Sequence, residues 1–79
     1  MDNYEKYVDI FASTFDVDKS DVEKLTYQCI EAWDSVGHMG LIAEIEDAFD
    51  IMMDTEDIID LSSFVKGKEI LSTKYGIKF

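Results

Sequence analysis

Apolar residues recur along two segments of this chain at the spacing of an α-helix, and this periodicity limits the fold more than any other feature. The first set has three- and four-residue spacings and comprises Tyr4, Tyr7, Val8, Phe11 and Phe15. The second set shares one helical face and comprises Leu41, Ile42, Ile45, Ala48 and Phe49, with Met52 in line if the helix continues. Each set is typical of a helix with one buried face. The absence of proline favours a compact helical unit over an assembly rich in linkers.

The size of the chain permits one small domain. Its 79 residues are enough for a single core, and we assign residues 1–79 to one domain. Hydrophobic residues make up 47% of the sequence, so a core can form and intrinsic disorder is not expected. A domain of this size has little room for an enclosed substrate pocket, which argues against an enzyme.

The expected fold begins with a helix that is followed by a long loop. Asp2 or Asn3 can cap the first helix. Residues 16–34 lack sustained periodicity and form the long first connection, in which Ser20 and Glu23 have the spacing of a capping box for a short helical turn. Four apolar residues are expected to pin this loop to the core: Val22, Leu25, Ile30 and Trp33.

Two further helices are expected after the loop. The second helix begins at Asp34 or Ser35 and runs to about Asp50. A short third helix starts within residues 54–57. Its apolar residues are expected to be buried, and these are Ile58, Ile59 and Leu61.

The last helix completes an all-α antiparallel bundle of three main helices and one short helix. Ser62 or Ser63 caps this helix, and Gly76 can end it in the left-handed conformation. Together with Leu61, its inner face is expected to carry Phe64, Val65, Leu71 and Tyr75.

The charge of the chain constrains its partners. Eighteen acidic residues against seven basic ones give a net charge of −11. Such a polyanion repels nucleic-acid phosphates and anionic membrane surfaces, so neither is an expected partner. The charge favours electrostatic steering toward basic proteins, or it serves solubility alone.

Cysteine content and hydropathy bear on the compartment. Cys29 is the only cysteine, so it forms no internal disulfide and no zinc site, and we expect a buried or half-buried thiol. The chain does not open on a signal-peptide pattern, and no apolar run approaches the length of a membrane span. We therefore expect a monomer in the cytoplasm.

The most informative motif is Asp34-Ser35-Val36 at the start of the second helix. It is followed by the acidic, amphipathic residues 41–50 and then, without a gap, by the 54–57 and 61–65 segments. Together these segments resemble the phosphopantetheine-attachment region of acyl carrier proteins. The resemblance covers about the last 46 residues, whereas the first helix is similar only in pattern and the loop only loosely.

The resemblance implies a function without catalysis. Ser35 would receive 4′-phosphopantetheine from coenzyme A through a phosphopantetheinyl transferase, and Asp34 would cap the helix beside it. The thiol of the arm would carry an acyl or aminoacyl group as a thioester between partner enzymes. These enzymes would load and transfer the cargo in a lipid, polyketide, peptide or polysaccharide-modifying pathway. Gly37 and Gly40 depart from the acids found early in this helix in carriers of fatty acid synthesis, and we infer dedicated partners.

A possible partner surface lies on the second helix, opposite its core face. This partner face comprises Val36, Met39, Ala43, Glu44 and Asp47. An apolar spot ringed by acids is typical of a docking surface for basic, partly apolar enzymes. Isolated apolar residues on a surface are also normal and need not bind anything.

Two other functions are compatible with the motif. The chain could be an acidic protein-interaction module that is never modified, since Asp and Ser are common helix caps. His38, one turn after Ser35, suggests a minimal hydrolase, but no third catalytic group is evident, and we expect a partly buried, hydrogen-bonded histidine. No metal site is expected, because the Asp16-x-Asp18-x-Ser20 pattern lacks the glycine and glutamate of a calcium loop.

Overall fold

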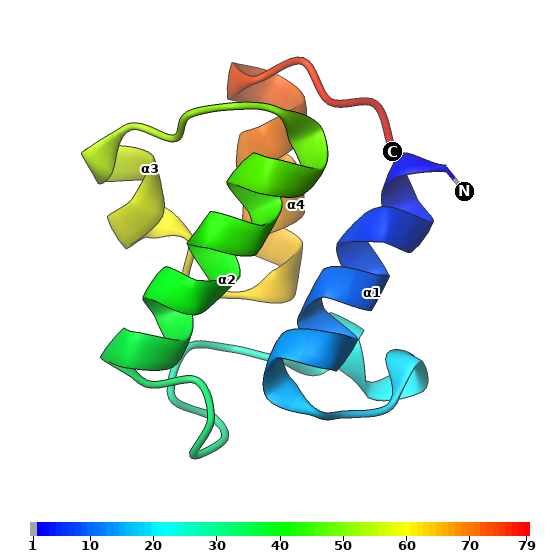
Figure 1. Cartoon of the computed structure of the whole chain (residues 1–79), viewed down its shortest axis with the longest axis vertical. Coiled ribbons are helices and arrows are strands. Elements are labelled where there is room, and N and C mark those ends of the chain that lie inside the picture. The colour runs from blue at the N-terminus through cyan, green and yellow to red at the C-terminus, as the bar shows by residue number, and fades with distance from the viewer. Residues whose placement is uncertain (1) are drawn as a thin grey trace.

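The computed structural model describes residues 2–79, which form a small helical bundle (Figure 1). The main helices are α1 (Asn3–Phe15), α2 (Ser35–Phe49) and α4 (Phe64–Lys74). A 3₁₀ helix, η1 (Lys19–Lys24), lies in the first connection, and the short α3 (Thr55–Asp60) links α2 to α4. The prediction of an all-α bundle with one short helix and a long first loop is confirmed.

The helices wrap around one core. In Figure 1, α1 runs antiparallel to α2 and α4, while α3 flanks α2 on the side away from α1. The start of α1 and the C-terminal tail lie close together, and the Asn3 side-chain amide donates a hydrogen bond of 3.0 Å to the Lys78 carbonyl oxygen. The Phe79 ring packs 5.4 Å from the Tyr7 ring, measured between centroids. The C-terminal tail is therefore part of the folded unit.

Local capping fixes the helix boundaries. The Asp2 carboxylate accepts from the Glu5 amide at 2.8 Å, and the Ser63 hydroxyl accepts from the Lys66 amide at 2.9 Å. Gly76 has a φ of 68°, so it ends α4 as predicted. These side chains satisfy amide groups that a helix leaves without internal partners.

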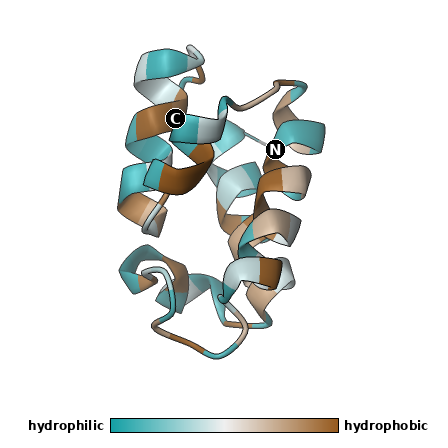
Figure 2. Ribbon diagram, turned by 90° about the vertical axis from the view of Figure 1, so that its left-hand side faces the viewer, coloured by the Kyte–Doolittle hydropathy of each residue, from teal (hydrophilic) through white to brown (hydrophobic). Residues whose placement is uncertain are grey.

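An aromatic cluster forms the centre of the core. Tyr7, Phe11 and Phe64 are almost fully buried, and the Tyr7 and Phe64 ring centroids lie 4.7 Å apart. The Tyr7 hydroxyl donates to the Phe64 carbonyl oxygen at 2.7 Å, which satisfies a polar group in an apolar interior. Burial raises the pKa of this hydroxyl far above its ordinary value. Figure 2 shows that each helix alternates hydrophobic and hydrophilic stretches, as amphipathic packing requires.

Two predictions of burial, those of Ile59 and Val65, are wrong, and the condition under which Met52 would join the core face of α2 is not met. Met52 is 87% exposed, since α2 ends at Phe49 and Asp50 takes a left-handed conformation that breaks the register. Ile59 lies on the outer side of the short α3 and is 72% exposed. Val65 is 59% exposed, while Ile70, which the sequence analysis missed, takes the buried position on α4.

The first connection also differs from its prediction in two details. Ser20 and Glu23 form no capping box, because the 3₁₀ helix begins after Asp18 and has no side-chain cap. Glu23 instead accepts a hydrogen bond from the Tyr4 hydroxyl. Cys29 is exposed rather than buried, and its sulfur accepts from the Thr26 amide at 3.2 Å. Of the four predicted anchors Val22, Leu25 and Trp33 are buried, and Ile30 is half-buried.

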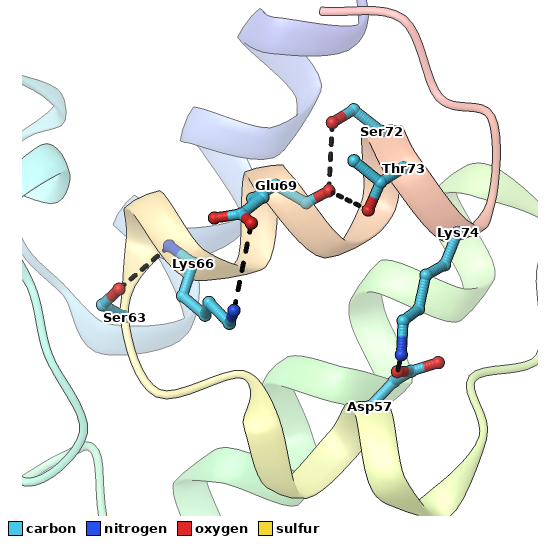
Figure 3. A network of polar contacts seen from close by, with 7 residues as sticks. All are labelled: Asp57, Ser63, Lys66, Glu69, Ser72, Thr73 and Lys74. Carbon is cyan, nitrogen blue, oxygen red and sulfur yellow. Dashed lines mark hydrogen bonds and ion pairs between the residues drawn. The ribbon is translucent and has the colours of Figure 1, made fainter.

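A buried carboxylate joins α3 to α4. Asp57 is 3% exposed, and one of its oxygens lies 2.7 Å from the Lys74 Nζ (Figure 3). Its other oxygen accepts from the Tyr75 hydroxyl at 2.7 Å. The hydrogen bonds from Lys74 and Tyr75 lower the pKa of Asp57 below its ordinary value. The Tyr75 hydroxyl in turn accepts from the Asp54 amide at 2.8 Å. Tyr75 therefore holds α3 both at its N-cap, Asp54, and within the helix, at Asp57.

We expect Asp57→Asn to destabilise the protein at pH 7 and to lose this effect in acid. The lowered pKa in the folded state means that the ionised carboxylate stabilises the fold above the unfolded value of about 3.9. That contribution disappears as the pH falls through the lower folded value. Urea unfolding of both proteins from pH 7 to pH 2.5 measures the difference.

Asp60→Asn, an exposed acid on the same helix, is the control for a general change of charge. A difference between wild type and Asp57→Asn that stayed constant down to pH 2.5 would contradict the assignment.

Candidate functional site

The loop that precedes α2 is held against the start of α4. The Tyr27 amide donates to the Ser62 carbonyl oxygen at 2.8 Å, and the Phe64 amide donates to the Leu25 carbonyl oxygen at 3.0 Å. Within the loop, the Gln28 amide donates to the Trp33 carbonyl oxygen at 3.0 Å. These bonds give an irregular segment a defined path toward the α2 N-terminus.

Trp33 anchors the end of this loop in the core. Its side chain has no exposed surface. The indole stacks on Phe15 with the ring centroids 5.0 Å apart, and it meets Phe11 edge to face at 5.6 Å. The chain that follows must therefore start α2 at a fixed point beside the core.

Asp34 and Ser35 occupy the first positions of α2, as predicted. Asp34 is the N-cap, and its carboxylate accepts from the Gly37 amide at 2.8 Å. Ser35 is the first helical residue, and its side chain is exposed. The first turn of α2 itself contains no acidic residue, so the carboxylate that lies beside its partially positive amides is that of the Asp34 cap.

Gly37 permits a close approach between the loop and the helix. A Cβ at this position would lie 2.0 Å from the Ala32 carbonyl oxygen, a backbone atom that cannot move aside alone. Gly40 lies one turn further on and has nothing within 4 Å of its Cβ position. The two glycines therefore have different roles: Gly37 is required by packing, whereas Gly40 is open to solvent.

His38 bonds to groups on both sides of α2. The Trp33 indole nitrogen donates to the His38 Nδ1 at 2.9 Å. The His38 Nε2 lies 2.7 Å from the Ile58 carbonyl oxygen of α3. The prediction of a partly buried, hydrogen-bonded histidine is confirmed, and both ring nitrogens are directed at partners other than Ser35.

An apolar pocket opens beside Ser35, between the start of α2, the loop and α3. Its volume is about 330 Å³. Its lining residues are Tyr27, Ser35, His38, Met39, Ile58, Ile59, Leu61 and Ser62. Sequence reasoning assigned Ser35 and Met39 to this region but missed Tyr27 and the α3 residues. Periodicity gives no signal for them, because the pocket forms only when α3 packs against α2.

The predicted partner face is exposed next to this pocket. Val36 is 79% exposed and Met39 is 56% exposed. The other three residues, Ala43, Glu44 and Asp47, are exposed as well. The exposed Ile59 of α3 also lines the pocket with Met39, so the apolar surface continues from α2 onto α3. Whether this surface binds a partner remains a prediction.

Residues 2–79 offer no grouping of side chains for a metal ion and no helix that could span a membrane. No three His, Cys, Asp or Glu side chains there are grouped so that they could hold a metal ion. None of the helices of those residues has both the length and the apolar character needed to cross a membrane. Comparisons of the chain with protein-family models, with curated proteins and with solved structures find no match.

We expect Gly37→Ala and Gly40→Ala to change stability in opposite directions. An alanine at Gly40 should stabilise the helix by about 0.5–1 kcal/mol, because glycine loses more backbone freedom on folding. An alanine at Gly37 should destabilise the protein by about 1–3 kcal/mol, because the Ala32 carbonyl must shift. Chemical denaturation of the two variants in parallel measures both signs. If Gly37→Ala were as stable as Gly40→Ala, the loop would not pack on α2 as described.

Proposed function

We propose that this protein is a phosphopantetheinylated carrier and that Ser35 is the attachment site. The observation that carries the proposal is the position of the Ser35 hydroxyl, which is exposed at the first residue of α2 and borders an apolar pocket. Attachment joins the Ser35 Oγ to the phosphorus of the pantetheine arm and releases adenosine 3′,5′-bisphosphate from coenzyme A. A separate phosphopantetheinyl transferase takes up the hydroxyl proton. The attached group supplies a thiol that holds cargo as a thioester.

The residues around Ser35 fit a tethered phosphodiester. The first amides of α2 have no partners within the helix, and helix N-termini favour anions. The Asp34 carboxylate, the acid nearest in sequence, is bonded to the Gly37 amide. It is thereby held toward the helix end. The exposed position of Ser35 leaves a route by which a transferase can reach the hydroxyl.

The pocket favours an apolar cargo. Four of its eight lining residues are Ile58, Ile59, Leu61 and Met39, and its volume of about 330 Å³ suits a modest acyl group. A charged group would lose hydration there without gaining an ionic partner. Acyl cargo is therefore favoured over a charged aminoacyl group.

The partner face suits enzymes with basic docking surfaces. Val36 and Met39 offer apolar contact area, while Glu44 and Asp47 lie on the same exposed side of α2. The net charge of −11 steers such enzymes toward the carrier. We infer a monomeric cytoplasmic carrier that serves dedicated partners of a lipid, polyketide, peptide or polysaccharide-modifying pathway. Gly40 is open to solvent and stands where carriers of fatty acid synthesis have acids early in the helix. This difference supports dedicated partners.

The alternative is an acidic interaction module that uses the same exposed face and is never modified. The geometry gives less support to a hydrolase, since neither ring nitrogen of His38 is free to accept a proton from Ser35. Modification of Ser35 separates the carrier from the module.

We expect incubation with coenzyme A and a broad-specificity phosphopantetheinyl transferase to add one phosphopantetheine to the wild-type protein. Ser35→Ala should remain unmodified, because it lacks the nucleophilic oxygen. Ser62→Ala is the matched control, since Ser62 lines the same pocket and is exposed. Intact-mass measurement follows all three proteins. A wild-type protein that stays unmodified, or an adduct that survives in Ser35→Ala, would favour the interaction module.

A further inference from the structure

His38 lies at the junction of three segments that surround Ser35. Through Trp33 it contacts the loop, through its own backbone it belongs to the first turns of α2, and through the Ile58 carbonyl oxygen it contacts α3. The His38 and Trp33 rings lie nearly parallel, with an angle of 14° between their planes, so the Trp33–His38 bond runs from ring edge to ring edge. The Tyr27 ring meets the imidazole edge to face, with 5.4 Å between centroids.

The chemistry of the two partners determines where the imidazole carries its proton. An indole N–H can only donate, so the His38 Nδ1 must accept and therefore carries no proton. A backbone carbonyl oxygen can only accept, so the His38 Nε2 must donate. Both bonds exist together only in the neutral ring with its proton on Nε2.

Protonation of the ring is incompatible with this arrangement. An imidazolium has N–H groups on both nitrogens, so its Nδ1–H would face the Trp33 N–H at 2.9 Å. Either the ring turns away or the indole N–H, on a side chain with no exposed surface, loses its partner. A buried donor without a partner is unfavourable, so the bridge between the loop and α3 would open.

The surroundings of His38 offer the imidazolium little compensation. The groups in contact with the ring are the Trp33 indole and Tyr27 phenol from the loop and the Ile58 carbonyl from α3. On α2, Asp34 accepts from the His38 amide through its backbone, while its carboxylate is bonded to Gly37. On α3, the carboxylate of Asp57 is bonded to Lys74 and Tyr75.

We propose that His38 is a positioning residue whose neutral ring fixes the loop and α3 around Ser35. Protonation of the ring breaks the contacts that hold α3 to α2. The inference rests on the proposed function, because it assigns the pocket beside Ser35 to a carrier. The Asp57 link keeps α3 on α4, so release widens the pocket along its Ile58 and Ile59 wall. Protonation of His38 thus loosens the site that holds the attached arm.

The first arm of the test uses the unmodified protein, whose single histidine and single tryptophan give unambiguous signals. Ring ¹⁵N shifts at pH 8 should show the proton on Nε2. Between pH 8 and 5, the range in which imidazoles titrate, hydrogen-exchange protection of the Trp33 indole and the Leu61 amide should fall by roughly tenfold. A proton on Nδ1 at pH 8, or protection that does not change with pH, would overturn the proposal.

Two variants separate positioning from a general structural role. His38→Gln retains one acceptor and one donor. The Trp33 indole and the Leu61 amide should therefore keep hydrogen-exchange protection that is independent of pH in this variant. His38→Ala should have roughly tenfold lower protection of the Leu61 amide at every pH. If His38→Ala kept wild-type protection, or if His38→Gln lost it with pH as the wild type does, the bridge would not depend on the imidazole.

The second arm measures loading of Ser35 by the transferase. The ratio of the wild-type rate to the His38→Gln rate cancels the pH dependence of the transferase itself. This ratio should stay constant above pH 7 and change at least threefold toward pH 5.5, and a constant ratio would contradict the proposal. If no protein were loaded at any pH, the proposed function would fail, while the first arm would still decide whether His38 forms the bridge.

Discussion

The burial of Trp33 is the constraint on which the rest of the site depends. The loop before α2 has no regular ladder of its own, so its path depends on a few backbone hydrogen bonds and on the largest side chain that it places in the core. Stacking on Phe15 and edge contact with Phe11 fix that side chain. Truncating a buried tryptophan typically costs about 3–5 kcal/mol, a large share of the stability of a small domain. Asp34 and Ser35 follow at once, so the core holds the α2 N-terminus while the Ser35 hydroxyl stays exposed.

The helix boundaries were predictable because their causes are local. Asp2, Asp34 and Ser63 each bond an amide three residues further along the chain, and such signals are present in any window of sequence. Burial in the short helix was not predictable in the same way. Ile59 and Asp57 are two residues apart, yet the apolar one is exposed and the acidic one is buried. The difference depends on Lys74 and Tyr75, which lie far along the chain and which α3 meets only in the folded protein.

The same distinction applies to the candidate site. Exposure of Ser35 and of the partner face followed from the register of α2 alone, since one face of that helix is packed. The pocket and the bond from His38 to Ile58 join residues twenty positions apart, so no periodicity could reveal them. Gly37 shows how the sequence alone was ambiguous. From the sequence, Gly37 could be interpreted as part of a surface for dedicated partners. The structure shows instead that packing against the Ala32 carbonyl requires a glycine at this position.

The distribution of acids along α2 bears on the proposed function. The first turn has none, whereas the second half carries Glu44, Glu46 and Asp47, and Asp50 is the C-cap. Glu46 is used within the fold, because its carboxylate accepts from the Met53 amide at 2.9 Å. Asp47 instead lies exposed in the last turn, where the helix dipole makes an acid unfavourable by a few tenths of a kcal/mol. The chain thus tolerates a small loss of stability to keep Asp47 on this exposed surface of α2. On the proposed function, the exposed Glu44 and Asp47 carboxylates face a basic docking enzyme, while the tethered phosphate lies at the first turn of α2, where the Asp34 carboxylate is bonded to the Gly37 amide.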